Sequence, residues 1–305
     1  MKRFLEKEWL PVIRPTVRRT TFLGYEGHVR NHIVPALGRK ALRSLDGRSL
    51  NSFYSSLADG NKNLAPSSVK RVHATIHRAL RDAVRWGYLK ANPADACDPP
   101  RDRGRNTEMR TWSAEQLGTF LRSVRSHRLY PMWVLLAMTG MRRGEALGLR
   151  WCDVDFAGSS LSVRQTLIAA GGDVHLAPPK TARGRRVIAL DARTVQTLKK
   201  YRQKQKPSDP NRLVFTDERG APLIPQKVSK EFGRLRHASR LPRIRLHDLR
   251  HTHATLALQA GIHPKIVSER LGHSAISFTL DVYSHALPHM QQEASERIGK
   301  LIFGS

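Results

Sequence analysis

Residues 65–89, APSSVKRVHATIHRALRDAVRWGYL, decide the fold class of the first part of the chain. Their apolar side chains recur every three or four positions, which is the spacing of one face of an α-helix. This apolar stripe consists of Val69, Val72, Ile76, Ala79, Ala83 and Val84. Ser67 and Ser68 predict where the helix begins, because serine hydroxyls cap helix N-termini. Cations occupy the other side of the helix: Lys70, Arg71, His77, Arg78 and Arg81.

The net charge of the chain indicates a polyanionic partner. Lys and Arg together number 53 against 25 Asp and Glu, a formal charge of +28 over 305 residues. A balance this basic favours nucleic acid, with an anionic membrane surface as the competing partner. The cations are spread along the whole chain, which favours folded domains that each contact a polyanion. We therefore expect Lys70, Arg71 and Arg78 to face DNA, with a solvated helix surface as the alternative.

The sequence also indicates where the protein works. No apolar run is long enough to span a bilayer, and charges interrupt the apolar residues of the first ten positions. Cys97 and Cys152 have neither metal-ligand spacing nor a disulfide framework. We expect a cytoplasmic, nucleoid-associated protein without a membrane anchor.

The chain divides into two predicted domains. Residues 1–91 have a helical pattern, and residues 92–111 combine proline, glycine and charge without periodicity, as a linker does. In residues 112–305, Ser113 and Gln116 predict a capping box, and a buried helix ends at Gly140. Residues 154–190 predict an antiparallel sheet of about three strands, by the count of turns. The predicted fold class is mainly α with a small antiparallel sheet.

Three clusters of polar residues can carry chemistry. TGMRRGEALGL (139–149) places Arg142 three residues before Glu145, which taken alone favours a local ion pair. RLHDLRHTHATLALQAG (245–261) places His247 and Arg250 on one helix face, and LGHSAISFTLDVYSH (271–285) ends near Tyr283. Arginine, lysine and histidine all donate to phosphate oxygens. Together the clusters predict a phosphoryl-transfer site in which protein groups alone stabilise the transition state. Tyr283 is its candidate nucleophile, although a packed aromatic is the simpler interpretation of that residue alone.

Other classes of protein remain as alternatives. The chain has no phosphate-binding nucleotide loop and no acidic cluster, so we expect neither a cofactor nor a metal. His247, His251 and His253 could instead hold zinc in a hydrolase, but the glutamate of the H-E-x-x-H motif is missing. Residues 263–280 could form the helix-turn-helix of a regulator without catalysis. A type IB topoisomerase would use similar chemistry.

In their combination and order, these motifs resemble the tyrosine recombinase, or phage integrase, family along almost the whole chain. TGMRRGEALGLRW resembles its first arginine box, PPKTARGRRVIAL its β-hairpin lysine segment, LHDLRHTHAT its H-x-x-R box and LGHSAISFTLDVYSH its closing box. The catalytic residues that the resemblance implies are Arg142, Lys180, His247, Arg250, His273 and Tyr283. The two arginines and His273 would bind the scissile phosphate, and Lys180 would protonate the leaving 5′ oxygen. His247 would assist proton transfer at Tyr283, which would form a 3′-phosphotyrosine link.

The resemblance also implies an architecture and partners. Residues 1–91 would be a helical, SAM-like core-binding domain, and residues 112–305 the catalytic domain. Four protomers on double-stranded DNA recombination sites would exchange strands through a Holliday junction and so integrate or excise a phage or mobile element. A directionality factor is a further expected partner. The chain starts almost directly on the core-binding helix, so we expect that an arm-binding domain is either absent or cut off, a feature that is Xer-like. The step from His273 to Tyr283 instead favours an integrase.

Three further residue roles are expected. Glu145 would orient Arg142 or its helix, while Arg143 would point away from Arg142, toward DNA or solvent. The chain ends in an apolar group, Leu301, Ile302 and Phe303. An exposed apolar end needs a cover. The resemblance predicts that the last helix docks in trans on a neighbouring protomer, and packing in cis is the alternative.

Overall fold

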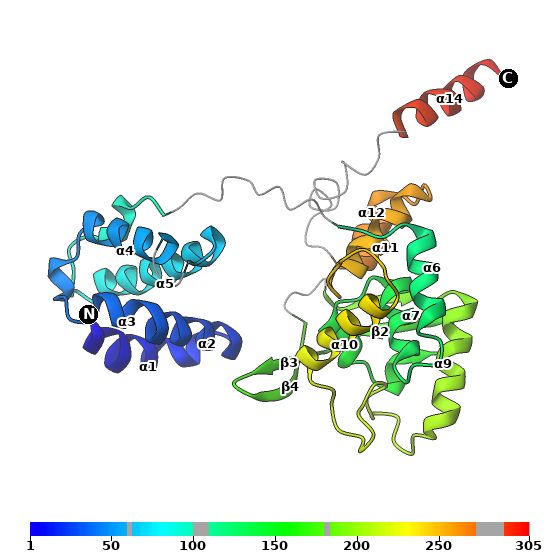
Figure 1. Ribbon diagram of the computed structural model, residues 1–305, viewed down its shortest axis with the longest axis horizontal. Coiled ribbons are helices and arrows are strands. Elements are labelled where there is room, and N and C mark those ends of the chain that lie inside the picture. Colours follow the sequence, from blue (N-terminus) through cyan, green and yellow to red (C-terminus); the bar gives the residue numbers. More distant parts are fainter. Residues whose placement is uncertain (60–62, 100–109, 180–183, 273–289, 305) are drawn as a thin grey trace. The chain divides into compact units, whose positions relative to one another are not determined.

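The computed structural model describes residues 1–59, 63–99, 110–179, 184–272 and 290–304. The chain divides into two compact units, Met1–Thr107 and Glu108–Ser305 (Figure 1). Helices dominate both units, and the second also contains two small antiparallel sheets. This arrangement confirms the predicted fold class. Within the described residues, no helix combines the length and the apolar character that crossing a membrane requires.

The first unit consists of helices around one apolar core. They are α1 (Leu10–Ile13), α2 (Arg19–His28), α3 (Val34–Leu37), α4 (Gly47–Asp59) and α5 (Pro66–Arg85), together with the π-helical segments η1 (Phe4–Trp9) and η3 (Val29–Ile33) and the 3-10 turns η2 (Arg14–Thr16), η4 (Leu42–Ser44) and η5 (Pro93–Ala96). The predicted stripe of α5 is buried in this core, except for Val84, which is half-buried. Trp9 and Leu50 lie in the same core with no exposed surface.

The start of α5 differs from the prediction. The helix begins at Pro66, and the preceding Ala65 makes no side-chain cap. Proline suits the first helical position because its missing N–H would have no intrahelical acceptor there. Ser67 and Ser68 therefore lie inside the first turn and do not cap the helix.

The first part of the predicted linker is packed. Asn92 accepts a hydrogen bond from the Ala94 backbone N at 3.0 Å and begins η5. Its side chain also donates to the His77 carbonyl of α5 at 3.3 Å, and the Asp98 backbone N donates to Asn51 of α4 at 2.9 Å. The loss of periodicity after residue 91 therefore marks a short turn on the surface of the first unit, and not the start of a free linker.

The second unit contains eight described helices longer than a 3-10 turn. They are α6 (Ala114–Ser123), α7 (Tyr130–Thr139), α8 (Arg143–Leu147), α9 (Ala192–Gln205), α10 (Pro225–Ala238), α11 (Asp248–Gln259), α12 (Pro264–Leu271) and α14 (Met290–Phe303). The predicted capping box at Ser113 and Gln116 begins α6. Helix α7 lies against α9 and α11 and is almost entirely buried (Figure 1).

The strands form two separate sheets. One has the order β1 (Val154–Asp155), β2 (Ser160–Val163) and β5 (Arg186–Ala189), all antiparallel, with Leu161 opposite Ile188. The other is a hairpin of β3 (Thr166–Ala170) and β4 (Asp173–Ala177). The predicted three-stranded antiparallel sheet is thus present, and the separate hairpin was not predicted.

Gly140 makes the turn that leads from α7 into the first polar cluster. It ends α7 with a positive φ of 63°, as the sequence predicts. A Cβ atom here would lie 2.5 Å from Leu271 Cδ2 and 2.8 Å from His253 Cδ2, so only glycine fits. The close approach places residues 141–145 against the end of α12.

Candidate active site

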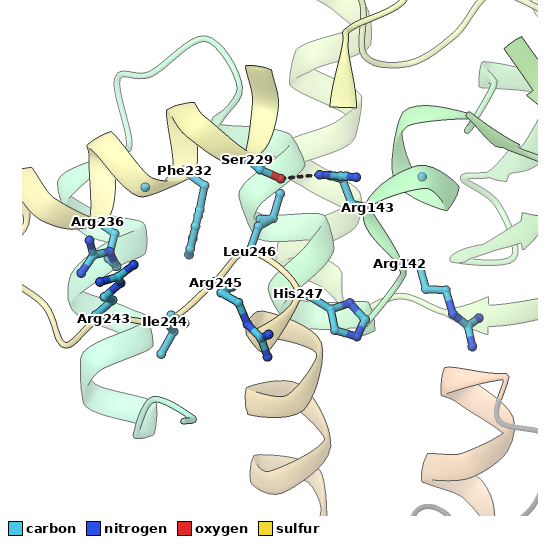
Figure 2. A pocket seen from close by; sticks show the side chains of 12 residues that line it. Arg142, Arg143, Ser229, Phe232, Arg236, Arg243, Ile244, Arg245, Leu246 and His247 are labelled. Atoms are coloured by element: carbon cyan, nitrogen blue, oxygen red, sulfur yellow. Dashed lines mark hydrogen bonds between the residues drawn. The ribbon is translucent and has the colours of Figure 1, made fainter. Parts of the chain in front are cut away.

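A basic pocket of about 680 Å³ opens where α8, α10 and the segment before α11 meet (Figure 2). Its described lining contains five arginines and no carboxylate: Arg142, Arg143, Gly144, Ser229, Phe232, Gly233, Arg236, Arg243, Ile244, Arg245, Leu246 and His247. Phe232, Ile244 and Leu246 supply its apolar part. A concave surface with this charge is suited to an anion.

Arg142 stands at the N-terminus of α8 and is held there by Glu145. Its backbone N donates to Glu145 Oε2 at 2.9 Å, and its Nη1 donates to Glu145 Oε1 at 2.8 Å. Its Nη2 reaches the Gly272 carbonyl at 3.3 Å. The side chain still has 43% of its surface exposed. The predicted ion pair and the predicted contact between Glu145 and Arg142 are therefore both present.

Arg250 lies in the first turn of α11, outside the described lining of the pocket, with 4% of its surface exposed. Its Nη1 donates to the Gly140 carbonyl at 2.8 Å, and its Nη2 donates to the Leu271 carbonyl at 2.8 Å. One buried guanidinium group thus binds the turn before Arg142 and the end of α12. These contacts join the three polar clusters of the sequence, although Gly140 in the first cluster and Leu271 in the last are more than a hundred residues apart.

His247 lines the pocket directly before α11 (Figure 2). His247 keeps exposed surface, but the pocket residues around its ring displace water, and this partial burial, followed by the positive charge of Arg250, lowers the pKa of His247. Nearby Asp248 opposes this only in part. The ring is therefore neutral near pH 7 and can accept a proton. The ring of His251 lies at right angles to it, with 5.1 Å between centroids.

The zinc alternative does not fit the position of His253. Its Nδ1 lies 3.0 Å from the Ala137 carbonyl, and its Nε2 accepts from Arg270 Nε at 3.3 Å. Burial lowers the pKa of His253 to about 4, so the neutral ring donates to one neighbour and accepts from the other. Both nitrogens are engaged, and no group of three potential ligands with metal-site geometry occurs in the described part of the chain.

Three of the predicted catalytic residues cannot be placed. Lys180, His273 and Tyr283 lie outside the described residues. The described neighbours Pro179 and Gly272 directly precede two of them, and the Gly272 carbonyl is in contact with Arg142. The helix-turn-helix alternative also extends into residues 273–280, so only its first helix, α12, is described.

The predicted DNA-contacting residues differ in their surroundings. Lys70 and Arg71 are exposed on α5. Arg78 is half-buried, and its Nε lies 3.3 Å from Asp82 Oδ2, so its charge is partly compensated. Arg143 points away from Arg142, as expected, but it is half-buried and donates to Ser229 Oγ on α10 (Figure 2). Contact of these residues with DNA stays a prediction.

Several residues near the site were not predicted. Arg186 of β5 donates to Glu145 Oε2 at 2.8 Å, the oxygen that also accepts from the Arg142 backbone N. Arg245 binds Asp248 at 2.9 Å, and its spacing of three residues is a signal that sequence reasoning could have used. Arg236 and Arg243 lie at the end of the pocket far from Arg142 (Figure 2). No local spacing marks Arg186, because its partner is 41 residues away.

Comparison with known proteins identifies the family. Residues 109–290 match the model of the phage integrase family, and residues 3–58 match that of the phage integrase N-terminal SAM-like domain. A tyrosine recombinase XerC-like protein of Caldanaerobacter subterraneus subsp. tengcongensis is 29% identical, over 96% of this chain and 81% of the relative. The ICEBs1 integrase of Bacillus subtilis is 24% identical, over 90% of this chain and 76% of the relative.

Solved structures share the fold. The Tn1549 transposon integrase, determined in complex with transposon right end DNA, superposes with a TM-score of 0.80 at 24% identity, covering 97% of this chain and 98% of that one. A lambda integrase tetramer bound to a Holliday junction gives 0.68 at 20% identity, covering 89% and 76%. The family model spans more than half of this chain and includes every predicted catalytic position. The chain therefore belongs to the phage integrase family of tyrosine recombinases, and it is a site-specific enzyme that cleaves and rejoins DNA.

Proposed function

We propose that the basic pocket receives the scissile phosphate of a double-stranded DNA recombination site, and that Tyr283 attacks it to form a 3′-phosphotyrosine link. The convergence around Arg142 and Arg250 carries this proposal. Through hydrogen bonds of 2.8 to 3.3 Å, their side chains connect the turn at Gly140 with the Leu271 and Gly272 carbonyls, directly before His273. The motifs that supply donors for a phosphate thus meet at one place.

Arg142 is suited to bind the phosphate because it is both exposed and oriented. Glu145 and the Gly272 carbonyl each accept one hydrogen bond from its guanidinium, and the exposed side chain keeps further N–H donors for phosphate oxygens. Arg250 would support the same phosphate from behind, together with His273. Fixed donors of this kind stabilise the charge of a phosphorane-like transition state without a metal ion.

His247 would assist the transfer of the tyrosine proton. A free tyrosine has a pKa near 10, so it needs a proton acceptor to attack at neutral pH. The lowered pKa of His247 keeps its ring neutral and available for that step. Lys180 would donate the proton that the leaving 5′ oxygen requires. The phosphotyrosine ester conserves the energy of the broken phosphodiester, so that the strand can be rejoined without a nucleotide cofactor.

The far end of the pocket would bind neighbouring backbone phosphates. Arg236 Nε is buried and has no hydrogen-bond acceptor among the described residues, and Arg243, which lines the same end of the pocket, is exposed. Buried donors without acceptors are costly, and a phosphate oxygen would satisfy them. Lys70, Arg71 and Arg78 of the first unit would add further backbone contacts.

The recombination reaction needs more than one protomer, and we propose a tetramer on DNA. The exposed fractions of Leu301, Ile302 and Phe303 at the end of α14 are 86%, 67% and 81%. Burying these side chains on a neighbouring protomer would stabilise such an assembly. The alternative is docking in cis, and a directionality factor would be a separate partner that selects integration or excision.

A nicked suicide duplex from the junctions of the mobile element tests this function. Cleavage beside the nick releases a short oligonucleotide that carries the leaving 5′ hydroxyl, and once this fragment dissociates it cannot reverse the reaction, so a covalent protein–DNA adduct accumulates. The wild type should form the adduct in EDTA, Tyr283→Phe should not, and the matched variant Tyr88→Phe should behave as the wild type. Absence of the adduct from the wild type would contradict the proposal, and dependence on zinc would favour the hydrolase. Relaxation of plasmids without a specific site or strand exchange would favour the topoisomerase.

A further inference from the structure

Arg186 is a buried arginine that binds acceptors from three segments of the catalytic unit. It lies on β5, and 7% of its side-chain surface is exposed. Its Nε donates to the Arg270 carbonyl in the last turn of α12 at 2.7 Å. Its Nη2 donates to Glu145 Oε2 at 2.8 Å, and its Nη1 donates to Glu145 Oε1 at 3.3 Å and to the Gly184 carbonyl at 3.2 Å.

Glu145 connects Arg186 with Arg142. The same carboxylate that accepts from Arg186 accepts from the backbone N and the Nη1 of Arg142, at 2.9 and 2.8 Å. The two arginines also bind neighbouring carbonyls at the end of α12, those of Arg270 and Gly272. The result is a closed ring of contacts in which β5, α8 and α12 are joined by two guanidinium groups and one carboxylate.

We propose that Arg186 is a positioning residue for DNA cleavage, which fixes the Glu145 carboxylate so that Arg142 is directed at the scissile phosphate. The proposal rests on the phosphate-binding role of Arg142 proposed above. Without Arg186, the guanidinium of Arg142 can bind both oxygens of Glu145, and such a bidentate pair would draw its donors away from the pocket. A displacement of about 1 Å at a reacting centre can cost about 100-fold in rate.

The ionisation of Glu145 supports the same assignment. Burial alone would raise the pKa of Glu145, but the hydrogen bond and charge of Arg186, and then those of Arg142, hold the pKa below its ordinary range. In the described residues, the charged groups in contact with this carboxylate are Arg142 at the start of α8 and Arg186 on β5. Loss of Arg186 removes the larger of the two compensating influences, so the pKa of Glu145 should rise.

Single-turnover cleavage of the suicide duplex at saturating DNA is the first test. Arg186→Met keeps most of the side-chain volume and removes every donor, and it should cleave about 100-fold more slowly with unchanged DNA affinity. Arg186→Lys keeps the charge but lacks the fork that reaches two acceptors, so its rate should be intermediate. The matched control is Arg185→Met, because Arg185 is the exposed neighbour, and it should cleave at the wild-type rate.

The pH profile separates positioning from general structural support. A carboxylate must be ionised to orient Arg142, so cleavage is lost as the pH falls through the pKa of Glu145. Raising that pKa in Arg186→Met should move the acid limb of the profile to higher pH. In the double variant Glu145→Gln/Arg186→Met, the limb that belongs to Glu145 should disappear and the limb that belongs to His247 should remain. A purely structural role would lower the rate equally at every pH.

A bridging phosphorothiolate identifies the group through which Arg186 acts. Sulfur at the 5′ bridging position leaves without being protonated, so this substrate bypasses the general acid but still needs Arg142. The defect of Arg186→Met should persist on it. Recovery of the wild-type rate would overturn the proposal, because Arg186 would then act on the general acid.

Two further outcomes would overturn the positioning role of Arg186. One is cleavage by Arg186→Met at the wild-type rate, and the other is a loss of cleavage that parallels a loss of DNA binding. If Arg186→Met does not fold, Arg186→Lys decides, and a wild-type rate and pH profile for that variant would contradict the proposal. A wild type that forms no covalent adduct would instead contradict the proposed function.

Discussion

Each unit of the chain contains a buried carboxylate held by two arginines, yet we assign the two carboxylates different roles. Asp82 lies in the core of the first unit, and Glu145 lies at the site in the second. Their ion-pair distances are similar, 3.1 and 3.3 Å at Asp82 and 2.8 Å for both pairs at Glu145. The arginines are Arg78 and Arg85 at Asp82, and Arg142 and Arg186 at Glu145.

The two clusters differ in where their partners come from. Arg78 and Arg85 stand four residues before and three after Asp82 on the same helix, and both are partly exposed. Among the described residues, the long-range side-chain partner of Asp82 is Trp9, whose Nε1 donates to Asp82 Oδ2 at 2.9 Å. Asp82 thus joins α5 to η1. Glu145 instead connects two arginines from distant segments, Arg186 on β5 and Arg142, which lines the pocket. A buried ion pair therefore marks a functional site only when one partner still has donors directed at a ligand.

Arg142→Ala should have the largest effect of the changes considered. It removes a donor to the phosphate, and losing one such donor costs about 100- to 1,000-fold in rate. The rate of adduct formation on the suicide duplex measures this at saturating DNA. DNA affinity should change little because many other cations contribute to it. If DNA affinity and cleavage rate fall equally, Arg142 does not act specifically in cleavage, and the functional difference from the cluster at Asp82 is contradicted.

Asp82→Ala should have the next largest effect, and on stability instead of chemistry. It leaves the buried Trp9 Nε1 without an acceptor, which costs about 2 kcal/mol. Hydrogen exchange of the full chain should report faster exchange of the α5 amides, while adduct formation at saturating DNA stays at the wild-type rate. Asp82→Asn keeps an acceptor for Trp9 and should lose less stability. Unchanged exchange in α5 would show that Asp82 does not hold these helices together.

Local spacing explains which features the sequence could predict. The capping box of Ser113 and Gln116, the end of α7 at Gly140 and the ion pair of Arg142 with Glu145 each involve residues at most four positions apart. Their geometry follows from helical spacing and from the conformational freedom of glycine. The buried stripe of α5 was predictable for the same reason.

Long-range contacts explain what the sequence could not predict. Arg186 reaches Glu145 across 41 residues, and Arg250 reaches Gly140 across 110. No periodicity records such a distance, so the sequence placed Arg250 in a polar cluster with His247 but did not predict its contact with the turn at Gly140. The packing of residues 92–98 on α4 and α5 was missed because proline and charge are as common in capped turns as in linkers.

Protonation of His247 should lower the cleavage rate about tenfold per pH unit, a smaller effect than that of Arg142→Ala. Burial and the charge of Arg250 lower the pKa of His247, so the neutral, proton-accepting form persists to lower pH. Cleavage should therefore begin to fall only below about pH 6.5, the ordinary value for histidine. A rate profile between pH 5 and 8 measures this, and His247→Asn should lose that limb. If cleavage already begins to fall above pH 6.5 as the pH is lowered, His247 is not neutral near pH 7 and the assignment is contradicted.

Arg85→Ala should have the smallest effect, although Arg85 pairs with a buried carboxylate at 3.1 Å. Its side chain is 68% exposed, so water screens the pair and already solvates most of the guanidinium. Exposed pairs at this helical spacing contribute about 0.3 to 0.5 kcal/mol. Denaturant unfolding should resolve a change of that size at most, and cleavage should be unaffected. A loss comparable with that of Asp82→Ala would mean that Asp82 depends on its charged partners more than on Trp9, and the two clusters would then be held together in the same way.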